Sequence, residues 1–524
     1  MSGGPSVPRW ARAAAVLLGA ALYALALPPW NYAALAWVTL VPLLLAIRGR
    51  SVWTGLCFGL LYGCTFGWTV TGWSLQAVMR YFGIGLPLAV LGLSVFYVVI
   101  FIPNFGLFGA GAALFLRREP SWAGRLGLSA LWSAAELIRC RLVGQPWGLL
   151  GYSQWAHTGI IQIAALTGVY GVSFLLVLGN VVVAEAISEV SESRRLRPGI
   201  LRITVVATAI AAIWANGALL ARRGPTGGFL GRSVAIVQTN VPPAFEWTRS
   251  YADRQLYAHI QATDQLPKNA NPALIVWPEN AVTEYLESDP MLAAQLAELA
   301  ARHHADLLFG APRYEAGRTF NSIRLITRDG RNGGYYDKQH LVLLAESGLL
   351  AEPPPSDRNE SPRAFSPGDG PAVLNSFVPI GVSICHEVIY PELTNQAVRA
   401  GAQLLVNVSN DGWLDAGSGV ASRQHFAMAI FRAVETRRYL VRGAISGISA
   451  VVDPYGHVVH ALEPHTTGVV MAGVAGRDTI TPYVRLGDLF ASTCGLVVVG
   501  LLTPRRSWSD RRRRDLASAP SVSS

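Results

Sequence analysis

The feature that most constrains this chain is the uneven distribution of its charged residues. Long stretches of residues 10–221, and again residues 484–503, are almost free of charged side chains, whereas residues 232–480 have the composition of a globular enzyme. Over all 524 residues, 51% are hydrophobic and 15% are charged, while a soluble protein carries roughly 25% charged residues. The distribution predicts a membrane protein with one large water-facing domain; a disordered, collagen-like, disulfide-rich or nucleic-acid-binding chain fits poorly.

The apolar segments predict about eight membrane spans, since a spanning helix needs about 20 mostly apolar residues. The fourth segment contains Pro103 and the fifth contains Glu136 and Arg139, so either each is one span, or the fourth is two spans and the fifth is none. Ala24-Leu25-Ala26 resembles a signal-peptide cleavage site, but the apolar run that follows at once favours an uncleaved first span. The candidate segments are residues 10–27, 31–47, 52–76, 82–116, 126–142, 163–188, 199–221 and 484–503.

These segments divide the chain into four predicted regions. They are an N-terminal transmembrane bundle at 1–221, a globular domain at 222–483, a final transmembrane helix at 484–503 and a basic cytoplasmic tail at 504–524. Arginines gather in alternate loops, which favours the cytoplasmic side for those loops and for the N-terminus. The odd number of spans before residue 222 then predicts that the globular domain faces away from the cytoplasm.

Within the globular region, short β-branched runs alternate with helical periodicity, which predicts an α/β domain. Residues 351–371 are rich in Pro, Ser, Asp and Glu and predict a long exposed loop. The predicted strands are 234–237, 274–277, 380–384 and 404–408, and the predicted helices are about 248–264, 290–303 and 422–438.

Two side chains at predicted strand ends, together with one lysine, could form an acyl-transfer site. Glu279 follows the strand 274–277, Cys385 follows the strand 380–384, and Lys338 is one of only two lysines, the other being Lys268. Open α/β sheets keep their chemistry beyond the carboxyl ends of strands. A glutamate could serve as base, a thiol as nucleophile and a lysine as oxyanion stabiliser.

Each residue also has a plain structural interpretation. A lone cysteine after an apolar strand is more often an inert core residue, a strand-end glutamate caps or faces solvent, and a lysine is usually a surface cation. His340 and His386 lack metal-ligand spacing, so we expect no metal, and the five cysteines predict neither a disulfide framework nor a zinc site.

The order of three motifs resembles the nitrilase superfamily. They are Trp277-Pro278-Glu279, Asp337-Lys338-Gln339-His340-Leu341-Val342, and Ile384-Cys385-His386-Glu387. The resemblance implies a four-layer αββα sandwich and a Glu-Lys-Cys triad acting on acyl bonds. Further agreeing pieces are residues 237–242, Phe320-Asn321-Ser322 and residues 407–413.

The membrane bundle narrows the resemblance to the apolipoprotein N-acyltransferases, a membrane-embedded branch of that superfamily. Bundle motifs that fit are Gly67-Trp68, Gly72-Trp73, Pro146-Trp147-Gly148 and residues 151–154. The implied fold is a multi-span α-helical membrane bundle of about eight spans plus an α/β nitrilase-like αββα sandwich domain.

Carried over by position, the resemblance makes Glu279 the general base, Lys338 the catalytic lysine and Cys385 the nucleophile. It implies supporting roles for five further residues, namely Trp247, Asn321, Glu346, His386 and Glu387. This chain departs from the family at Leu343-Leu344-Ala345-Glu346-Ser347, which leaves the placement of Glu346 open, and at His386, where the family usually has another aromatic residue.

The implied function is the transfer of a fatty acyl chain from a phospholipid of the phosphatidylethanolamine or phosphatidylglycerol class to a diacylated apolipoprotein, through a cysteine thioester and without a cofactor. The implied setting is the bacterial inner membrane, with the catalytic domain on the periplasmic face of a monomer and residues 343–371 as a candidate lid. Two alternatives remain: a membrane-tethered amidase or nitrilase, and a transporter or lipid-binding protein whose nitrilase-like domain is inactive.

Overall fold

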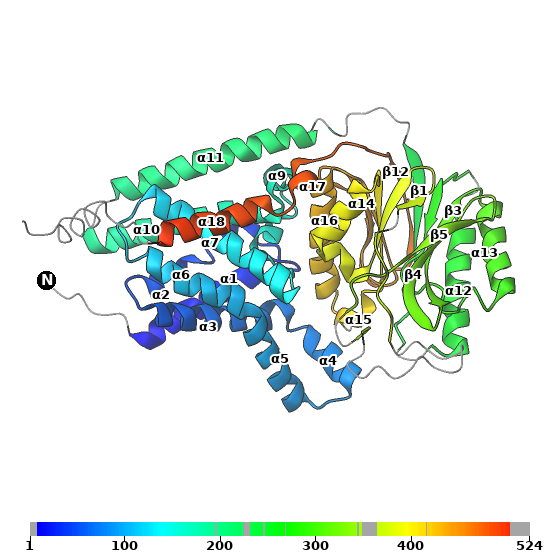
Figure 1. Cartoon of the computed structure of the whole chain (residues 1–524), viewed down its shortest axis with the longest axis horizontal. Coiled ribbons are helices and arrows are strands. Elements are labelled where there is room, and N and C mark those ends of the chain that lie inside the picture. Colours follow the sequence, from blue (N-terminus) through cyan, green and yellow to red (C-terminus); the bar gives the residue numbers. More distant parts are fainter. Residues whose placement is uncertain are drawn as a thin grey trace, which may run out of the picture.

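A computed structural model gives the fold of most of the chain. It describes residues 8–193, 196–222, 224, 231–244, 247–267, 269–342, 345–347, 364–371, 373–415 and 417–503. Lys268, most of the predicted loop 351–371 with the candidate lid, and the basic tail 504–524 lie outside the described residues. A helical bundle and a domain with two β-sheets lie side by side along the long axis of the molecule (Figure 1).

The N-terminal bundle is built from apolar helices and several short irregular turns. Within the part of the chain that the structure describes, four helices are long and apolar enough to cross a membrane: Arg9–Ala26, Leu86–Phe115, Val169–Ser191 and Arg197–Arg222. The prediction of spanning helices is therefore confirmed, while the count of eight stays a prediction. The bundle elements are α1 (Arg9–Ala26), η1 (Ala33–Trp37), α2 (Val41–Ile47), α3 (Val52–Thr71), α4 (Ser74–Phe82), α5 (Leu86–Phe101), η2 (Ile102–Gly106), α6 (Leu107–Phe115), α7 (Trp122–Ile138), η3 (Arg139–Val143), η4 (Leu150–Gln154), α8 (Thr158–Ile161), α9 (Ala164–Thr167), α10 (Val169–Ser193) and α11 (Arg197–Arg222), joined at the end of the chain by α17 (Pro482–Leu486) and α18 (Leu489–Leu502).

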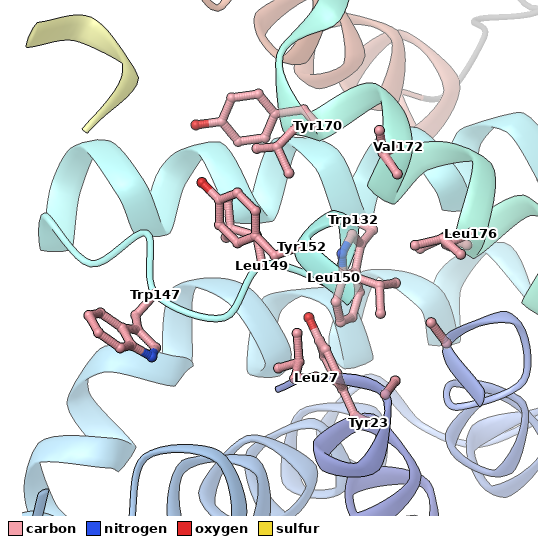
Figure 2. Packing of buried hydrophobic residues seen from close by; sticks show 14 of the residues in the cluster. Tyr23, Leu27, Trp132, Trp147, Leu149, Leu150, Tyr152, Tyr170, Val172 and Leu176 are labelled. Atoms are coloured by element: carbon pink, nitrogen blue, oxygen red, sulfur yellow. The ribbon is translucent and has the colours of Figure 1, made fainter. Parts of the chain in front are cut away.

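The predicted fourth span, 82–116, is one apolar stretch with a π turn at Pro103. Proline removes a backbone donor and bends a helix, and α5 and α6 continue on either side. The predicted fifth span is α7, which ends in the π turn η3. Tyr23, Trp132 and Leu150 pack together in the centre of the bundle (Figure 2), so large rings fill the space between helices.

The globular domain contains two six-stranded sheets whose strand orders mirror each other, β12-β1-β2-β3-β4-β5 and β11-β10-β9-β8-β7-β6. The predicted strands are confirmed as β1, β2, β7 and β8, and the predicted helices as α12, α13 and α16. The elements are β1 (Arg232–Gln238), α12 (Arg249–Asp264), β2 (Leu274–Val276), α13 (Pro290–Arg302), β3 (Asp306–Glu315), β4 (Arg318–Ile326), β5 (Asn332–Asp337), β6 (Val373–Asn375), β7 (Pro379–Ile384), η5 (Cys385–Ile389), α14 (Pro391–Arg399), β8 (Leu404–Ser409), α15 (Gly412–Asp415), α16 (Val420–Thr436), β9 (Leu440–Ala444), β10 (Ser449–Val452), β11 (Val458–Leu462) and β12 (Gly468–Val474).

Three apolar clusters order the layers of this domain. One lies between the two sheets, and a second lies between α12, α13 and the first sheet. A third joins α14 and α16 to the second sheet and continues without interruption into the bundle. The domain is thus a four-layer αββα sandwich whose outer helical layer packs on the bundle, as Figure 1 also shows.

Candidate active site

Strand direction brings the three candidate catalytic side chains to one edge of the sandwich. Strands β1, β2 and β3 are parallel, and two antiparallel pairings lead from β3 to β5, so β5 runs in the same direction as β3. Glu279 follows β2, Lys338 follows β5 and Cys385 follows β7. Lys338 Nζ lies 3.3 Å from Glu279 Oε1, and the charges of both residues act on the Cys385 thiol.

Lys338 is buried between two carboxylates. Its Nζ lies 2.8 Å from Glu346 Oε1 as well as 3.3 Å from Glu279, and only 1% of its surface is exposed. Burial lowers the pKa of the Lys338 ammonium, but the charges of Glu346 and Glu279 outweigh burial and raise this pKa above its ordinary value. Lys338 is therefore a fixed cation at neutral pH.

Amide groups hold the Glu279 carboxylate in place. Asn321 Nδ2 donates to Glu279 Oε1 at 2.8 Å and to Glu346 Oε1 at 2.9 Å. The backbone N–H of Asn410 donates to Glu279 Oε2 at 2.8 Å. Gly310 on β3 lets this turn approach closely, because a Cβ there would lie 2.7 Å from the Glu279 Cα. One carboxylate oxygen thus faces the lysine while the other faces β8.

The Cys385 thiol sits on a turn that few residues adopt. Cys385 has φ of 53°, in the left-handed region, where non-glycine residues are uncommon and strain gathers at functional sites. Asn407 Nδ2 donates to the Cys385 carbonyl at 3.2 Å. Burial, followed by the charge of Glu279, raises the pKa of the Cys385 thiol, and the smaller effect of Lys338 does not reverse this. The thiol is neutral at rest and needs a base to become a nucleophile.

Glu387 ties the end of β5 to the η5 turn. Its Oε1 accepts the backbone N–H groups of Gln339 at 2.7 Å and His340 at 3.1 Å. Its Oε2 accepts the N–H of Ile384 at 2.7 Å, and the Tyr336 hydroxyl donates to both oxygens at 3.0 Å. Burial raises the pKa of Glu387 to about 7 although the backbone N–H groups lower it.

Glu346 is held by a hairpin that extends from the bundle. The Tyr81 hydroxyl of α4 donates to the carbonyl of Ala345 at 2.6 Å, and α4 and α5 project from the bundle beside the sandwich (Figure 1). The backbone N–H of Val342 donates to Glu346 Oε2 at 2.8 Å. These contacts place Glu346 on Lys338 despite the unusual sequence of this segment.

The remaining predicted supporting residues are His386 and Trp247. The His386 ring meets the Tyr390 ring edge to face at 5.5 Å, and burial, followed by the charge of Lys338, lowers the pKa of His386, so the ring is neutral. Trp247, which lies in the sequence between β1 and α12, is half-buried, and its role stays a prediction.

Residues behind Cys385 were missed as site residues. Asp411 accepts a hydrogen bond from Arg442 at 2.9 Å and contacts His425 Nδ1 at 3.1 Å. Burial raises the pKa of Asp411, but the charges of Arg442 and His425 outweigh it and hold this pKa below its ordinary value. Polar residues after the predicted strand 404–408 were the available signal for Asp411. Arg442 lies inside β9, a strand that was not predicted because the sequence there has no long apolar run.

Comparison with known proteins places the chain in a family. Residues 233–481 match the carbon-nitrogen hydrolase family, and residues 19–182 match the apolipoprotein N-acyltransferase N-terminal domain. The chain is similar to the apolipoprotein N-acyltransferase of Geobacter metallireducens, at 32% identity over 96% of each chain. The chain belongs to the apolipoprotein N-acyltransferase family.

A second curated relative agrees with this assignment. The apolipoprotein N-acyltransferase of Azotobacter vinelandii is 32% identical over 98% of this chain and 97% of its own length. Among solved structures, an amidase of the nitrilase superfamily from Nesterenkonia is 19% identical over 50% of this chain, with a TM-score of 0.37. The predicted superfamily and its membrane-embedded branch are confirmed, and the alternative of a tethered amidase has less support.

Proposed function

We propose that this apolipoprotein N-acyltransferase family member transfers a fatty acyl chain from a membrane phospholipid to the N-terminal amine of a diacylglyceryl-cysteine on an apolipoprotein. The names of its relatives support acyl transfer to lipoproteins over hydrolysis of a small amide. The observation that carries the chemistry is the buried Lys338 between Glu279 and Glu346, beside the Cys385 thiol.

In the first half-reaction, Glu279 accepts the thiol proton as Cys385 Sγ attacks the ester carbonyl of the phospholipid. Lys338 stabilises the tetrahedral oxyanion, which suits an ammonium that stays charged at neutral pH. The intermediate collapses, the proton held by Glu279 passes to the leaving alkoxide, and a lysophospholipid departs. The acyl chain remains on Cys385 as a thioester.

In the second half-reaction, the α-amine of the acceptor attacks the thioester carbonyl. Glu279 accepts the amine proton and returns it to the departing Cys385 sulfur, so an amide forms and the thiol is restored. Asn321 and the Asn410 N–H keep Glu279 in place through both steps. Glu346 positions Lys338, and Glu387 fixes the turn of the nucleophile.

The membrane setting follows from the predicted topology. We propose about eight spans, with the sandwich on the periplasmic face of the bacterial inner membrane and the protein acting as a monomer. Ester carbonyls of phospholipids lie near the headgroup level, which a domain resting on the outer end of the bundle can reach. Donors of the phosphatidylethanolamine or phosphatidylglycerol class would supply the chain.

A chase experiment separates the transferase from a hydrolase. The purified protein is first incubated with phosphatidylethanolamine and then given a diacylglyceryl-cysteine peptide. We expect the peptide to acquire one acyl chain by an amide bond far faster than free fatty acid appears. Release of fatty acid at the same rate with and without the peptide would contradict the proposal and favour the hydrolase.

A further inference from the structure

Two tryptophans from the bundle motifs converge on one side chain of the catalytic domain. The indole N–H groups of Trp73 and Trp147 donate to the same Oε1 of Gln424, at 3.2 Å and 2.8 Å. Their ring centroids lie 5.4 Å apart. Figure 2 shows Trp147 on the loop before η4, apart from the aromatic centre of the bundle around Trp132. The two indoles therefore belong to the junction with the catalytic domain.

The remaining capacity of the Gln424 carboxamide is used on the same side of the junction. Its Nε2 donates to the carbonyl of Pro28 at 3.1 Å and to the carbonyl of Val70 at 2.9 Å. A carboxamide offers two donors and two acceptor sites, so these four contacts satisfy it completely. Gln424 is buried, which makes every contact costly to lose. One side chain thus fixes the ends of α1 and α3 and both indoles.

The same stretch of α16 reaches the candidate active site. His425, the next residue, packs its ring 5.6 Å from the ring of Trp147 and contacts Asp411. Asp411 directly follows Asn410, whose N–H holds Glu279, and its charge acts on the Cys385 thiol. A chain of contacts through His425 and Asp411 therefore leads from the Trp147 indole toward the nucleophile.

We propose that Gln424 is a positioning residue for the phospholipid donor: it holds Trp73 against the buried Trp147 so that the partly exposed Trp73 ring guides the donor's acyl chain and ester from the bundle to Cys385. This inference rests on the proposed function. The Trp147 ring is buried against Trp73 and His425. The partly exposed ring of Trp73 remains for hydrocarbon contact, a role that suits tryptophan where apolar and polar surroundings meet.

The test compares Gln424→Met, which keeps the length of the side chain without its hydrogen bonds, with wild type. Thioester formation on Cys385 is followed by intact mass across a series of phosphatidylethanolamine concentrations. We expect the KM for phospholipid to rise about tenfold or more, since more than one buried hydrogen bond is lost. Alkylation of Cys385 by iodoacetamide, which needs no lipid, should keep its wild-type rate.

Gln162→Met is the matched control. Gln162 is another buried glutamine that joins the bundle to the domain, through the Tyr455 carbonyl at 2.9 Å and Arg437 at 2.6 Å, and it should leave the KM unchanged. If Gln424→Met does not fold, Trp73→Phe combined with Trp147→Phe removes the two indole donors and should raise the same KM.

The outcomes separate the two proposals. If wild-type protein forms no thioester, the proposed function fails. If wild type forms the thioester and the Gln424 and tryptophan variants match its KM, the positioning role fails while the proposed function stands. A parallel fall in iodoacetamide reactivity would place Gln424 in support of the triad, and would overturn its role toward the lipid.

Discussion

Lys338 lies closer to Glu346 than to Glu279, with Nζ at 2.8 Å from the first carboxylate and 3.3 Å from the second. Asn321 donates to the same oxygen of each carboxylate that faces the lysine. The charge of Lys338 is therefore shared. Glu346 and Asn321 thus help to hold the Lys338 ammonium beside Glu279.

The first prediction concerns this sharing. In Glu346→Gln, Lys338 loses its nearer ionic partner and keeps Glu279, so the ammonium is held less firmly in the site. We expect thioester formation to slow by about ten- to a hundredfold, the equivalent of about 1.5–3 kcal/mol for a charged hydrogen bond. Glu315→Gln, which changes an exposed glutamate paired with Arg313, is the control. Equal rates for both variants would contradict the role of Glu346.

The second prediction concerns the cation itself. Lys338→Met leaves an apolar side chain of similar length and no donor for the oxyanion. Loss of one such donor costs about 10²–10³ in rate, and we expect a fall of at least that size. Lys338→Arg keeps the charge, but a planar guanidinium does not fit a site built around a compact ammonium. Near wild-type rates in Lys338→Arg would argue for a purely ionic role.

The third prediction concerns pH. The pKa of Glu387 is raised to about 7 by burial, so lowering the pH through 7 protonates it and removes an acceptor from its four donors. We expect acyl transfer to decline on this acid limb. The Glu387→Gln variant, which lacks the carboxylate at every pH, should transfer acyl chains slowly at pH 8, as wild type does at lower pH. If Glu387→Gln transfers acyl chains at the wild-type rate at pH 8 and shows the same decline at low pH, Glu387 does not cause that decline.

The raised pKa of Glu387 makes stability depend on pH in the direction opposite to activity. Because the folded protein binds this proton more tightly than the unfolded chain does, the contribution of Glu387 to the free energy of unfolding is greatest below the usual range for glutamate. It falls as the pH rises through about 7. The Glu387→Gln variant should lose this component, which thermal melts across pH can measure.

The fourth prediction concerns the contact between α3 and α6. A Cβ at Gly55 would lie 2.2 Å from the carbonyl oxygen of Gly109, and the reverse clash is equally close. Small residues let membrane helices approach in this way. Gly55→Ala should lower the melting temperature in detergent, because overpacking reduces the free energy of unfolding by about 1–3 kcal/mol. Gly92→Ala, in open space on α5, should not, and equal melting temperatures would refute the close contact.

The sequence predicted those strands and helices in which one hydrophobic pattern is clear along the segment. Strand β2 is wholly apolar, strands β7 and β8 are mostly apolar, and all three are largely buried. The residues that follow them include Glu279, Cys385 and Asn410. Strand β4 was missed because Asn321 and Ser322 are polar yet buried, and their hydrogen bonds to site residues compensate for burial. Such bonds depend on partners distant in sequence.

Hydropathy located the apolar segments correctly but did not predict the lengths of the helices within them. The predicted span 31–47 is broken into η1 and the short α2, and 484–503 contains the 14-residue helix α18. Local turns set these breaks, and an average over a window does not detect them. Gln424 was missed for a related reason, because a polar residue on a helix reveals its role only when the bundle that receives its hydrogen bonds is in place.

The most direct test of the central claim is the intact mass of the purified protein after incubation with phosphatidylethanolamine, measured beside Cys385→Ala. We expect one added fatty-acyl mass on wild type, mapped to Cys385, removed by hydroxylamine and absent from the variant. The absence of an adduct with any phospholipid, or an adduct that persists in Cys385→Ala, would contradict the claim that this cysteine carries the acyl chain.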